Sequence, residues 1–459
     1  MTKWTRRSVL AAGLGLAGCM RAERPSLGEL YASAQYRIDQ PPLIVIPGAF
    51  GSALLDRSSG REIWPGPDTR LLFSRYWELE LAIDPARLEP LPGHVEASEI
   101  FKRGLGRDFY GQVLDTLQGA GGYSRCSTCE RPRPGRRNFY VYIYDFRLDN
   151  VAVVRGLHEL IEQIRHEYGD SRLPVDILAH SNGGLLARYY ARYGTEDVLD
   201  AATPVPTYAG APAIRRLLLV GTPNLGTMQP VLSHTRGEEI GFAKIPPEVM
   251  ATCPAPPQIM PHPSLAWLAT PDGRVLQRDL YDVATWQEFQ WSIFAPDVAE
   301  RTIANHGGGA EGRRYLDTLH AYMAKQFQRG RRFAESLSVA GDERDVRPYV
   351  FGGDCAPTLK RLVVEEVKGR HLARERIADI ARPVAGVDYS ALMFEPGDLV
   401  VTRSSLVGRI NHDLAAPRDR NESMRIAHSV FLCEEHQSLT GNPSFQDNLL
   451  YALLSVDEA

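Results

Sequence analysis

The sequence predicts an α/β fold in which helices cover both faces of a mostly parallel sheet. Short apolar stretches rich in β-branched residues alternate along the chain with amphipathic stretches of helical periodicity. Parallel strands are buried on both faces, so they appear as continuous apolar runs, and helices connect them. The chain has 459 residues, of which 44% are hydrophobic, and this suffices for one large domain with insertions.

The first elements each have a local signal. "PPLIVIPG" (41–48) is an apolar run between proline and glycine, which predicts a buried strand. "GRDFYGQVLDTLQGAGG" (106–122) has apolar residues at helical spacing and ends at glycines, which predicts a helix. "NFYVYIYD" (138–145) is β-branched and aromatic, so a strand is expected. "NVAVVRGLHELIEQIRHEYGD" (150–170) is an amphipathic helix that ends in glycine.

The next stretch repeats the alternation more tightly. "PVDILAH" (174–180) predicts a buried strand, "GLLARYYARYG" (184–194) a helix, and "RRLLLVGTP" (215–223) a further strand. These elements and the earlier ones give the first part of the core, residues 20–223. A strand followed at once by a helix also places the residues between them at the carboxyl edge of the sheet.

The alternation stops between residues 224 and 345, a segment that we predict to be a lid or cap insertion. It is rich in proline and methionine at first, and "GRRYLDTLHAYMAKQFQRGRRFAESL" (312–337) predicts one long amphipathic helix. Insertions over one end of a sheet commonly form lids and substrate pockets, although such a segment can also be ordinary core of a large domain.

The second part of the core is predicted to span residues 346–459. The sheet is expected to resume with "RPYVFGG" (347–353), "LKRLVVEEV" (359–367) and "HSVFLCEE" (428–435). A final helix is predicted over "SFQDNLLYALL" (444–454).

The N-terminus, "MTKWTRRSVLAAGLGLAGC" (1–19), has the layout of an export signal, with a basic start, a short apolar stretch and small residues. The pair Arg6-Arg7 resembles a twin-arginine signal, and "LAGC" resembles the bacterial lipoprotein processing site. Cleavage there would leave Cys19 as a lipidated N-terminus that anchors the protein to a membrane without spanning it. We therefore expect an exported, lipid-anchored protein of the cell envelope. The alternative is a frayed N-terminal helix.

Charge and cysteine content restrict the partners and sites. The net charge of −4 provides no basic field, so nucleic acid is not an expected partner. Cys126 and Cys129 form a C-x-x-C in a polar loop, without the second ligand pair of a zinc site or the helix of a redox site. A local loop disulfide is therefore predicted for this pair.

Ser181 is the candidate nucleophile. In "AHSNG" it lies between a predicted strand and a predicted helix, with small residues two positions before and two after it. A tight strand-to-helix turn presents such a serine at the top of a sheet, and the usual pattern is G-x-S-x-G, where Ala179 here replaces the first glycine. The alternative is a serine that only caps the helix.

A serine nucleophile needs a general base, and His412, His428 and His436 occur late enough in the chain to follow the last strands. His412 lies in a polar loop, and His428 begins the last predicted strand and should therefore lie at the opposite end of the sheet. His436 follows that strand, at the correct edge, and is the candidate base.

The acid and the oxyanion hole are less sharply determined by these patterns. Asp354 ends one predicted strand and Asp398 lies on a Pro-Gly turn, and either one could orient the imidazole. The backbone N–H of Asn182 is a predicted oxyanion donor because it follows the nucleophile, and Ala49, after the first strand, is the candidate second donor. Phe50 is expected to line the acyl pocket.

Several segments together resemble the lecithin:cholesterol acyltransferase-like family of α/β-hydrolases. These segments are "VIPGAFGSALLD", "REIWPGP", "IYDFRLD", "AHSNGGLLARYY", "LLVGTPNLGT", "PPQIMPHPS", "EPGDLVVTRSSL" and "EHQSLTGNP". The resemblance implies an α/β-hydrolase fold, favours Asp398 over Asp354 as the acid, and adds Trp64 of "REIWPGP" to the expected substrate pocket. The chain departs from the family pattern at Phe146, which replaces a tryptophan, and at Leu399, which replaces a glycine.

These residues predict a serine hydrolase or acyltransferase that acts on ester-linked acyl groups, with lipids as the expected substrates. The reaction would proceed through an acyl-serine and needs no metal or organic cofactor. A peptidase or amidase with the same machinery is one alternative, and a non-catalytic envelope lipoprotein that binds lipid is another. Asp145 and Arg147 are expected to form a structural ion pair, with head-group contact as the alternative reading.

Overall fold

The computed structural model describes residues 26–36, 40–127, 132, 136–339, 341, 346–408 and 424–454. The predicted signal segment 1–19 with Cys19, the second cysteine of the predicted loop disulfide, Cys129, and the candidate base His412 lie outside these residues. Their predicted roles stay predictions.

A seven-stranded sheet forms the core, and every neighbouring pair of its strands is parallel. The strand order across it is β21-β16-β12-β11-β1-β10-β9. The strands are β1 (Leu43–Ile46), β9 (Tyr123–Arg125), β10 (Arg137–Val141), β11 (Val175–His180), β12 (Ile214–Val220), β16 (Tyr349–Gly353) and β21 (His428–Leu432). The central strands β1, β11 and β12 are almost wholly buried, as their apolar runs predict.

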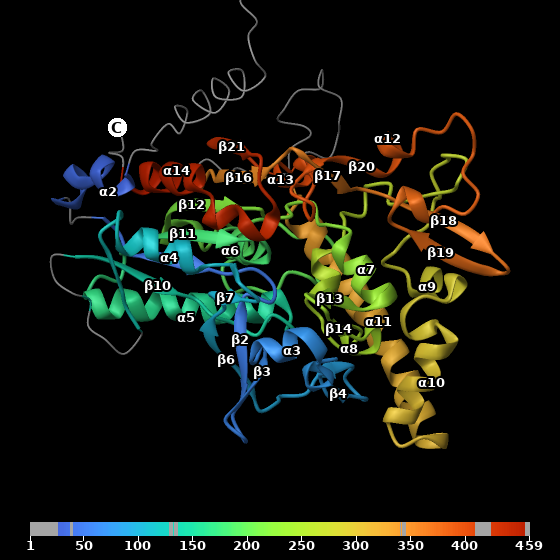
Figure 1. Ribbon diagram of the computed structural model, residues 1–459. Helices are drawn as coiled ribbons and strands as arrows, with labels where there is room; N and C mark the ends of the chain where they lie inside the picture. Colours follow the sequence, from blue (N-terminus) through green and yellow to red (C-terminus); the bar gives the residue numbers. More distant parts are fainter. Residues whose placement is uncertain are drawn as a thin grey trace, which may run out of the picture.

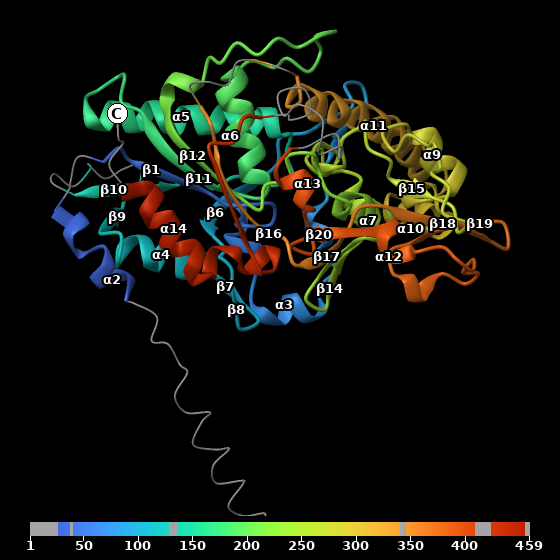
Figure 2. The ribbon, with the colours of Figure 1, turned by 90° about the horizontal axis from the view of Figure 1, so that it is seen from above.

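Helices cover both faces of this sheet. Figure 2 shows α5 (Asn150–Tyr168) and α6 (Asn182–Tyr193) on one side, and α4 (Gly111–Gln118) and α14 (Pro443–Leu454) on the other. A separate hydrophobic cluster fills each side, with Ile44 and Leu157 in one cluster and Leu43 and Leu449 in the other. The α/β-hydrolase fold class predicted from the sequence is therefore confirmed.

Two strands differ from the prediction. The stretch 359–367 does form β18 (Leu362–Val367), but this strand does not belong to the core sheet. It pairs with β15 (Leu268–Ala269) and β19 (Arg370–Arg374) in a separate three-stranded sheet. Strand β9 forms within a stretch that reads as polar loop, because its backbone adds to the exposed edge of β10. Polar residues are tolerated at such an edge.

The segment between β12 and β16 packs beside the core, where Figure 1 shows its helices to the right of the sheet. It contains α7 (Gln229–Arg236), β13 (Glu238–Ile240), β14 (Ala243–Ile245), α8 (Pro247–Met250), α9 (Val283–Phe289), α10 (Pro296–Asn305) and α11 (Gly309–Ser336). These elements have a hydrophobic cluster of their own, which includes Trp286 and Phe327. Because β18 pairs with β15 of this segment and β19 pairs with β18, residues beyond 346 also contribute to this layer. The division of the chain at residues 224 and 346 stays a proposal.

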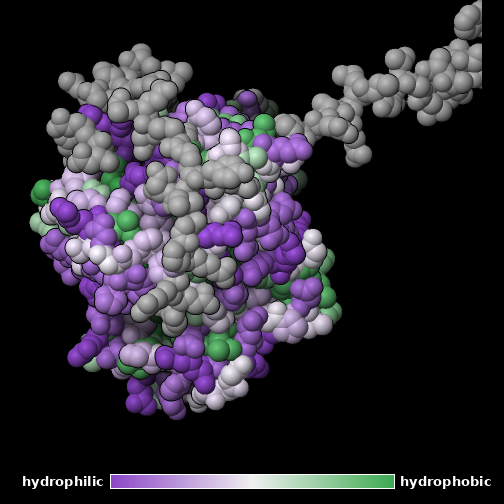
Figure 3. All heavy atoms as spheres, turned by 90° about the vertical axis from the view of Figure 1, so that its left-hand side faces the viewer, coloured by the Kyte–Doolittle hydropathy of each residue, from purple (hydrophilic) through white to green (hydrophobic). Residues whose placement is uncertain are grey.

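Smaller elements complete the molecule. They are α2 (Leu27–Leu30), β2 (Ser52–Asp56), β3 (Arg61–Trp64), α3 (Asp68–Phe73), β4 (Ile83–Asp84), β5 (Glu89–Pro90), β6 (Val95–Ile100), β7 (Arg103–Gly104), β8 (Arg107–Asp108), β17 (Ala356–Leu359), α12 (Tyr389–Met393), β20 (Phe394–Gly397) and α13 (Arg403–Leu406). None of the helices that the structure describes combines the length and the apolar character that a bilayer span needs. The face at the left of Figure 1 is mostly hydrophilic with scattered hydrophobic side chains (Figure 3), which is ordinary for a protein surface.

Candidate active site

Ser181 lies on the tight turn between β11 and α6, at the carboxyl edge of the sheet. Its backbone has φ 54° and ψ −125°, a region that a serine rarely adopts. The turn is crowded: a Cβ on Gly183 would lie 2.6 Å from the carbonyl oxygen of Pro47, and one on Gly184 would lie 2.0 Å from Oγ1 of Thr222. Glycine is needed at both positions: Gly183 lets the turn pack against the end of β1, and Gly184 lets it pack against Thr222 after β12.

Ser181, His436 and Asp398 form one hydrogen-bonded chain. The Nε2 of His436 lies 3.0 Å from the Oγ of Ser181, and its Nδ1 lies 2.9 Å from Oδ2 of Asp398. Asp398 is fully buried and His436 is 7% exposed. The other carboxylate oxygen of Asp398, Oδ1, accepts hydrogen bonds from the backbone N–H groups of Val400 (3.1 Å) and Val401 (2.6 Å). These bonds hold the carboxylate in one orientation toward the imidazole.

Asp398 and His436 are also joined through their backbones. Asp398 follows β20, and His436 begins a 3-10 helix (His436–Gly441) after β21. The N–H of His436 donates to the carbonyl oxygen of Asp398 at 2.9 Å. A disulfide between Cys355 and Cys433 ties the segment after β16 to the segment just before His436. This pair was not foreseen among the cysteines of the sequence.

The other acid and base candidates lie elsewhere. Asp354 forms an ion pair with Arg403 at 3.5 Å. His428 begins β21, and its ring lies tilted beside that of Tyr349, the first residue of β16, with centroids 6.3 Å apart. This is the end of the sheet opposite to Ser181. Of the late histidines in the described part of the chain, His436 is the one that reaches the serine.

The turn after β1 lies directly against the turn that carries Ser181. A Cβ on Gly48 would lie 2.7 Å from the Cβ of Ser181 and 3.3 Å from its Oγ. Ala49 follows Gly48 and lines the same pocket as Ser181, while Asn182 is the first residue of α6. Both predicted oxyanion donors therefore belong to segments that touch Ser181. The side chain of Asn182 is fixed by two reciprocal hydrogen bonds with the side chain of Asn150, at 3.0 and 3.1 Å.

A buried network that sequence reasoning missed connects these two turns to the His436 loop. The Tyr110 hydroxyl accepts from the N–H of Gly48 at 2.8 Å and lies 2.8 Å from Nδ1 of His180. Burial, with the neighbouring His436, lowers the pKa of His180 to about 3, so its imidazole is neutral. Nδ1 then accepts from Tyr110, and Nε2–H donates to the carbonyl oxygen of His436 at 3.2 Å. His180 directly precedes Ser181, but its partner Tyr110 lies 70 residues away along the chain.

We expect Tyr110 to be a positioning residue. Tyr110→Phe leaves the Gly48 N–H and the His180 Nδ1 without their partner, and we expect kcat to fall by about tenfold, with KM changed by less than about twofold. Steady-state kinetics on an ester substrate measures both values. The matched control is Tyr123→Phe, because the buried Tyr123 hydroxyl has no hydrogen-bond partner among the described residues. Equal losses in the two variants, or a loss confined to KM, would contradict the positioning role.

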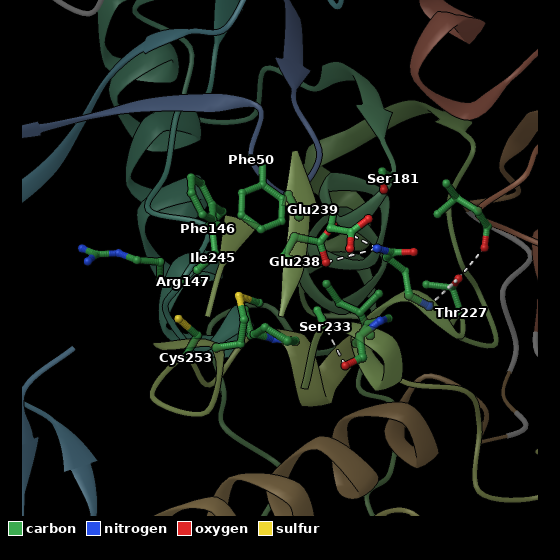
Figure 4. A pocket seen from close by; sticks show the side chains of 18 of the residues that line it. Phe50, Phe146, Arg147, Ser181, Thr227, Ser233, Glu238, Glu239, Ile245 and Cys253 are labelled. Atoms are coloured by element: carbon green, nitrogen blue, oxygen red, sulfur yellow. Dashed lines mark hydrogen bonds between the residues drawn. The ribbon is translucent and has the colours of Figure 1, made fainter. Parts of the chain in front are cut away.

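Two cavities meet at Ser181 and His436. One, of about 270 Å³, is lined in part by residues between β12 and β16 and is shown in Figure 4. The second, of about 580 Å³, is lined by Trp64, Tyr110 and Phe242 among others. Phe50 lines both cavities, and its ring packs against Trp64 and Phe146, with centroids 5.3 and 4.6 Å apart. Phe50 and Trp64 thus lie where the sequence predicts a substrate pocket.

Asp145 and Arg147 form a buried ion pair in which Arg147 donates from Nε and Nη2 to the two carboxylate oxygens, at 2.9 and 2.6 Å. Its Nη1 donates to the carbonyl oxygen of Leu79, and Figure 4 shows the guanidinium directed away from Ser181. This arrangement agrees with the framework role. Leu399, which stands where the resembled family has glycine, adopts φ 75°, a left-handed conformation that normally favours glycine.

Among the residues that the structure describes, no group of three or more His, Cys, Asp and Glu side chains is arranged to hold a metal ion.

Comparisons with known proteins place the chain only by its fold. No protein-family profile matches the sequence, and no curated protein matches it. A chain in the crystal structure of the Tle4–Tli4 complex superposes with a TM-score of 0.55 at 15% identity, covering 91% of this chain and 98% of that chain. EstA from Clostridium botulinum gives a TM-score of 0.35 at 11% identity, over 95% of this chain and 96% of that chain. The first likeness shows a shared fold, and the second is too weak to support a conclusion.

Proposed function

We propose that this protein is a serine hydrolase or acyltransferase that acts on ester-linked acyl groups through an acyl-serine. The observation that supports this most is the hydrogen-bonded chain from Ser181 Oγ through His436 to buried Asp398, on a strained strand-to-helix turn that opens into two cavities. A serine held in this way has a base in reach and a carboxylate that orients the base.

In the first half of the reaction, His436 Nε2 takes the proton from Ser181 as Oγ attacks the ester carbonyl carbon. The backbone N–H groups of Ala49 and Asn182 stabilise the oxyanion that forms. His436 then gives its proton to the alcohol oxygen as the ester bond breaks, which leaves an acyl-serine and a free alcohol. Asp398 holds the Nδ1–H tautomer and stabilises the imidazolium.

In the second half, water or another alcohol enters, and His436 takes its proton as its oxygen attacks the acyl carbon. Collapse of this intermediate returns the proton to Ser181 and releases an acid or a new ester. The apolar lining of both cavities, which includes Phe146, Met250 and Trp64, supports a lipid or another ester with apolar chains as substrate. Membership of the lecithin:cholesterol acyltransferase-like family is part of this proposal and rests on the sequence motifs.

A substrate panel on the purified protein tests the proposal. We expect esters and phospholipids to be cleaved and amides of the same acyl groups to be left intact, and a fluorophosphonate probe to label the peptide that contains Ser181. Adding an alcohol to the assay separates transfer from hydrolysis by product analysis. Exclusive cleavage of amides would identify a peptidase or amidase instead, and absence of both turnover and labelling in folded protein would favour a lipid-binding envelope protein.

Export and lipid anchoring through Cys19 are the part of the proposal that rests on the sequence alone. Mass spectrometry of the mature N-terminus in a host with lipoprotein processing tests it, because acylation adds the mass of the lipid to Cys19. An unmodified N-terminus upstream of Cys19 would contradict it.

A further inference from the structure

A carboxyl group lies in the wall of the cavity that Figure 4 shows. Glu238, the first residue of β13, is 8% exposed, and it lines the same cavity as Ser181. Most of the surrounding wall is apolar: Leu79, Phe146, Ile245, Val249, Met250 and Ile259. A carboxyl group in such a wall is costly to bury and calls for a physical reason.

The contacts of Glu238 within the protein are polar but carry no positive charge. Nε2 of Gln229 donates to both carboxyl oxygens, at 2.9 and 3.1 Å, while the nearby Ser233 hydroxyl donates to the carbonyl oxygen of Pro230 at 3.1 Å. The basic residues on the neighbouring elements pair elsewhere, since Arg236 contacts Glu375 and Lys244 lies 4.0 Å from Glu239. Two carboxylate oxygens accept about four hydrogen bonds, so acceptor capacity is left for a ligand in the cavity.

Glu238 lines both cavities, and these differ in a way that assigns the acyl chain to the smaller one. The rim of the larger cavity includes Arg107 and Phe242, which are exposed, and Phe242 is 83% exposed. The alcohol must leave to solvent after the first half of the reaction, whereas the acyl group stays bonded to Ser181. The smaller cavity, whose wall is mostly buried, therefore suits the acyl chain.

On the basis of the proposed function, we infer that Glu238 is a specificity-determining residue that binds a hydroxyl group on the acyl chain of the ester. A plain alkyl chain in the cavity would displace water from the carboxyl group of Glu238 and could donate no hydrogen bond in place of the water. A hydroxyl can donate to this group, and it costs less to desolvate than an ammonium in a mostly apolar cavity. Gln229 holds the carboxyl group in place for this contact.

The test compares pairs of esters of equal chain length, one plain and one with a hydroxyl, in a series that moves the hydroxyl one carbon at a time. We expect kcat/KM for the best hydroxylated ester to exceed that of its plain partner by at least about tenfold. In Glu238→Leu this ratio should fall by about tenfold or more, because the hydroxyl then meets an apolar wall. Glu366→Gln is the control, and it should leave the ratio unchanged, since Glu366 is exposed on β18 and lines neither cavity.

The pH dependence of the same ratio gives a second readout. Burial raises the pKa of Glu238 to about 7, so the group ionises near neutral pH. A hydroxyl donates more strongly to the ionised form, and a plain chain is tolerated worse beside it, so the ratio should rise as pH rises through about 7. Any effect of pH on the catalytic steps themselves is common to both esters and cancels in the ratio. Other charged or titratable groups around Glu238 are Glu239, Arg236, His234, Lys244, Arg147, Cys253 and His436.

Glu238→Gln separates recognition from a structural role. It keeps the shape of the side chain but cannot ionise, so the pH dependence of the ratio should disappear while part of the preference remains. If Glu238→Leu does not fold, this variant alone decides. A wild-type ratio near one for every hydroxyl position, a ratio that the variants do not change, or a stronger preference for an amino-substituted chain would overturn the inference. Cleavage of plain esters with labelling of Ser181 would still uphold the proposed function in each case.

Discussion

Replacing Ser181 by alanine is expected to lower kcat for a cleaved ester by about 10⁴-fold or more, to the level that binding and oxyanion stabilisation alone provide. The loss comes from the nucleophile itself, because alanine cannot form the acyl intermediate. The fold should persist, since alanine and serine meet the same backbone strain at φ 54°. Initial rates with a chromogenic ester and thermal unfolding by circular dichroism measure the two expectations.

The control for this variant is Ser124→Ala, which changes a half-buried serine on the edge strand β9. It should leave kcat within about twofold of the wild type, as is usual for a substitution remote from the site. Ser181→Ala combined with His436→Ala should be no slower than Ser181→Ala alone, because residues that act as one unit do not lose activity additively. Retention of more than a tenth of the wild-type kcat by Ser181→Ala would refute the acyl-serine mechanism.

The predictable part of the fold is the part that local pattern determines. The strands β1, β11 and β12 are buried on both faces, so their sequences are largely apolar. Their positions can therefore be predicted from the sequence. The turn at Ser181 can be predicted from the sequence for a related reason. Gly183 and Gly184 are required where the turn contacts Pro47 and Thr222. Small residues on either side of a serine, between a predicted strand and a predicted helix, therefore indicate a tightly packed turn.

Long-range pairing is the part that local pattern does not determine. Strand β18 has the apolar character of a core strand, yet it pairs with β15 and β19 in another layer. Tyr110 reaches His180 across 70 residues, and its own neighbours in sequence resemble any amphipathic helix start. Glu238 is one glutamate among several in a charged stretch, and only the packing of α7 and β13 buries it. These features depend on which helices and strands pack against each other. Hydrophobic periodicity predicts the type of an element but not its packing partner.

Leu399 shows a different limit. The resemblance expects glycine after the acid, and the backbone there does adopt φ 75° although the residue is leucine. The turn is therefore held by its surroundings, including the N–H of Leu399, which donates to Thr358 at 2.9 Å. A departure from a motif can thus leave its geometry in place, at a cost of about 1 kcal/mol or more in backbone strain.

The choice between the two candidate acids leads to the other large effect. In Asp398→Asn the N–H groups of Val400 and Val401 continue to donate to the Oδ1 position, so the amide oxygen must occupy it. The amide NH₂ then faces Nδ1 of His436, where Oδ2 now accepts. Two donors cannot face each other, so Nδ1 becomes the acceptor and Nε2 carries the proton. An imidazole in that tautomer cannot take the proton of Ser181, and we expect kcat to fall by about 10⁴-fold.

Asp354→Asn is the matched comparison, because it makes the same chemical change at the other candidate. Asp354 is partly exposed and pairs with Arg403 at 3.5 Å, so we expect a loss of less than about threefold. Steady-state kinetics for both variants, with thermal unfolding to verify folding, gives the ranking. A larger loss in Asp354→Asn would transfer the role of the acid to Asp354. Small losses in both variants would mean that His436 needs neither carboxylate. Another group would then have to set the tautomer of the imidazole, and the roles proposed for Ser181, His436 and Asp398 would be wrong.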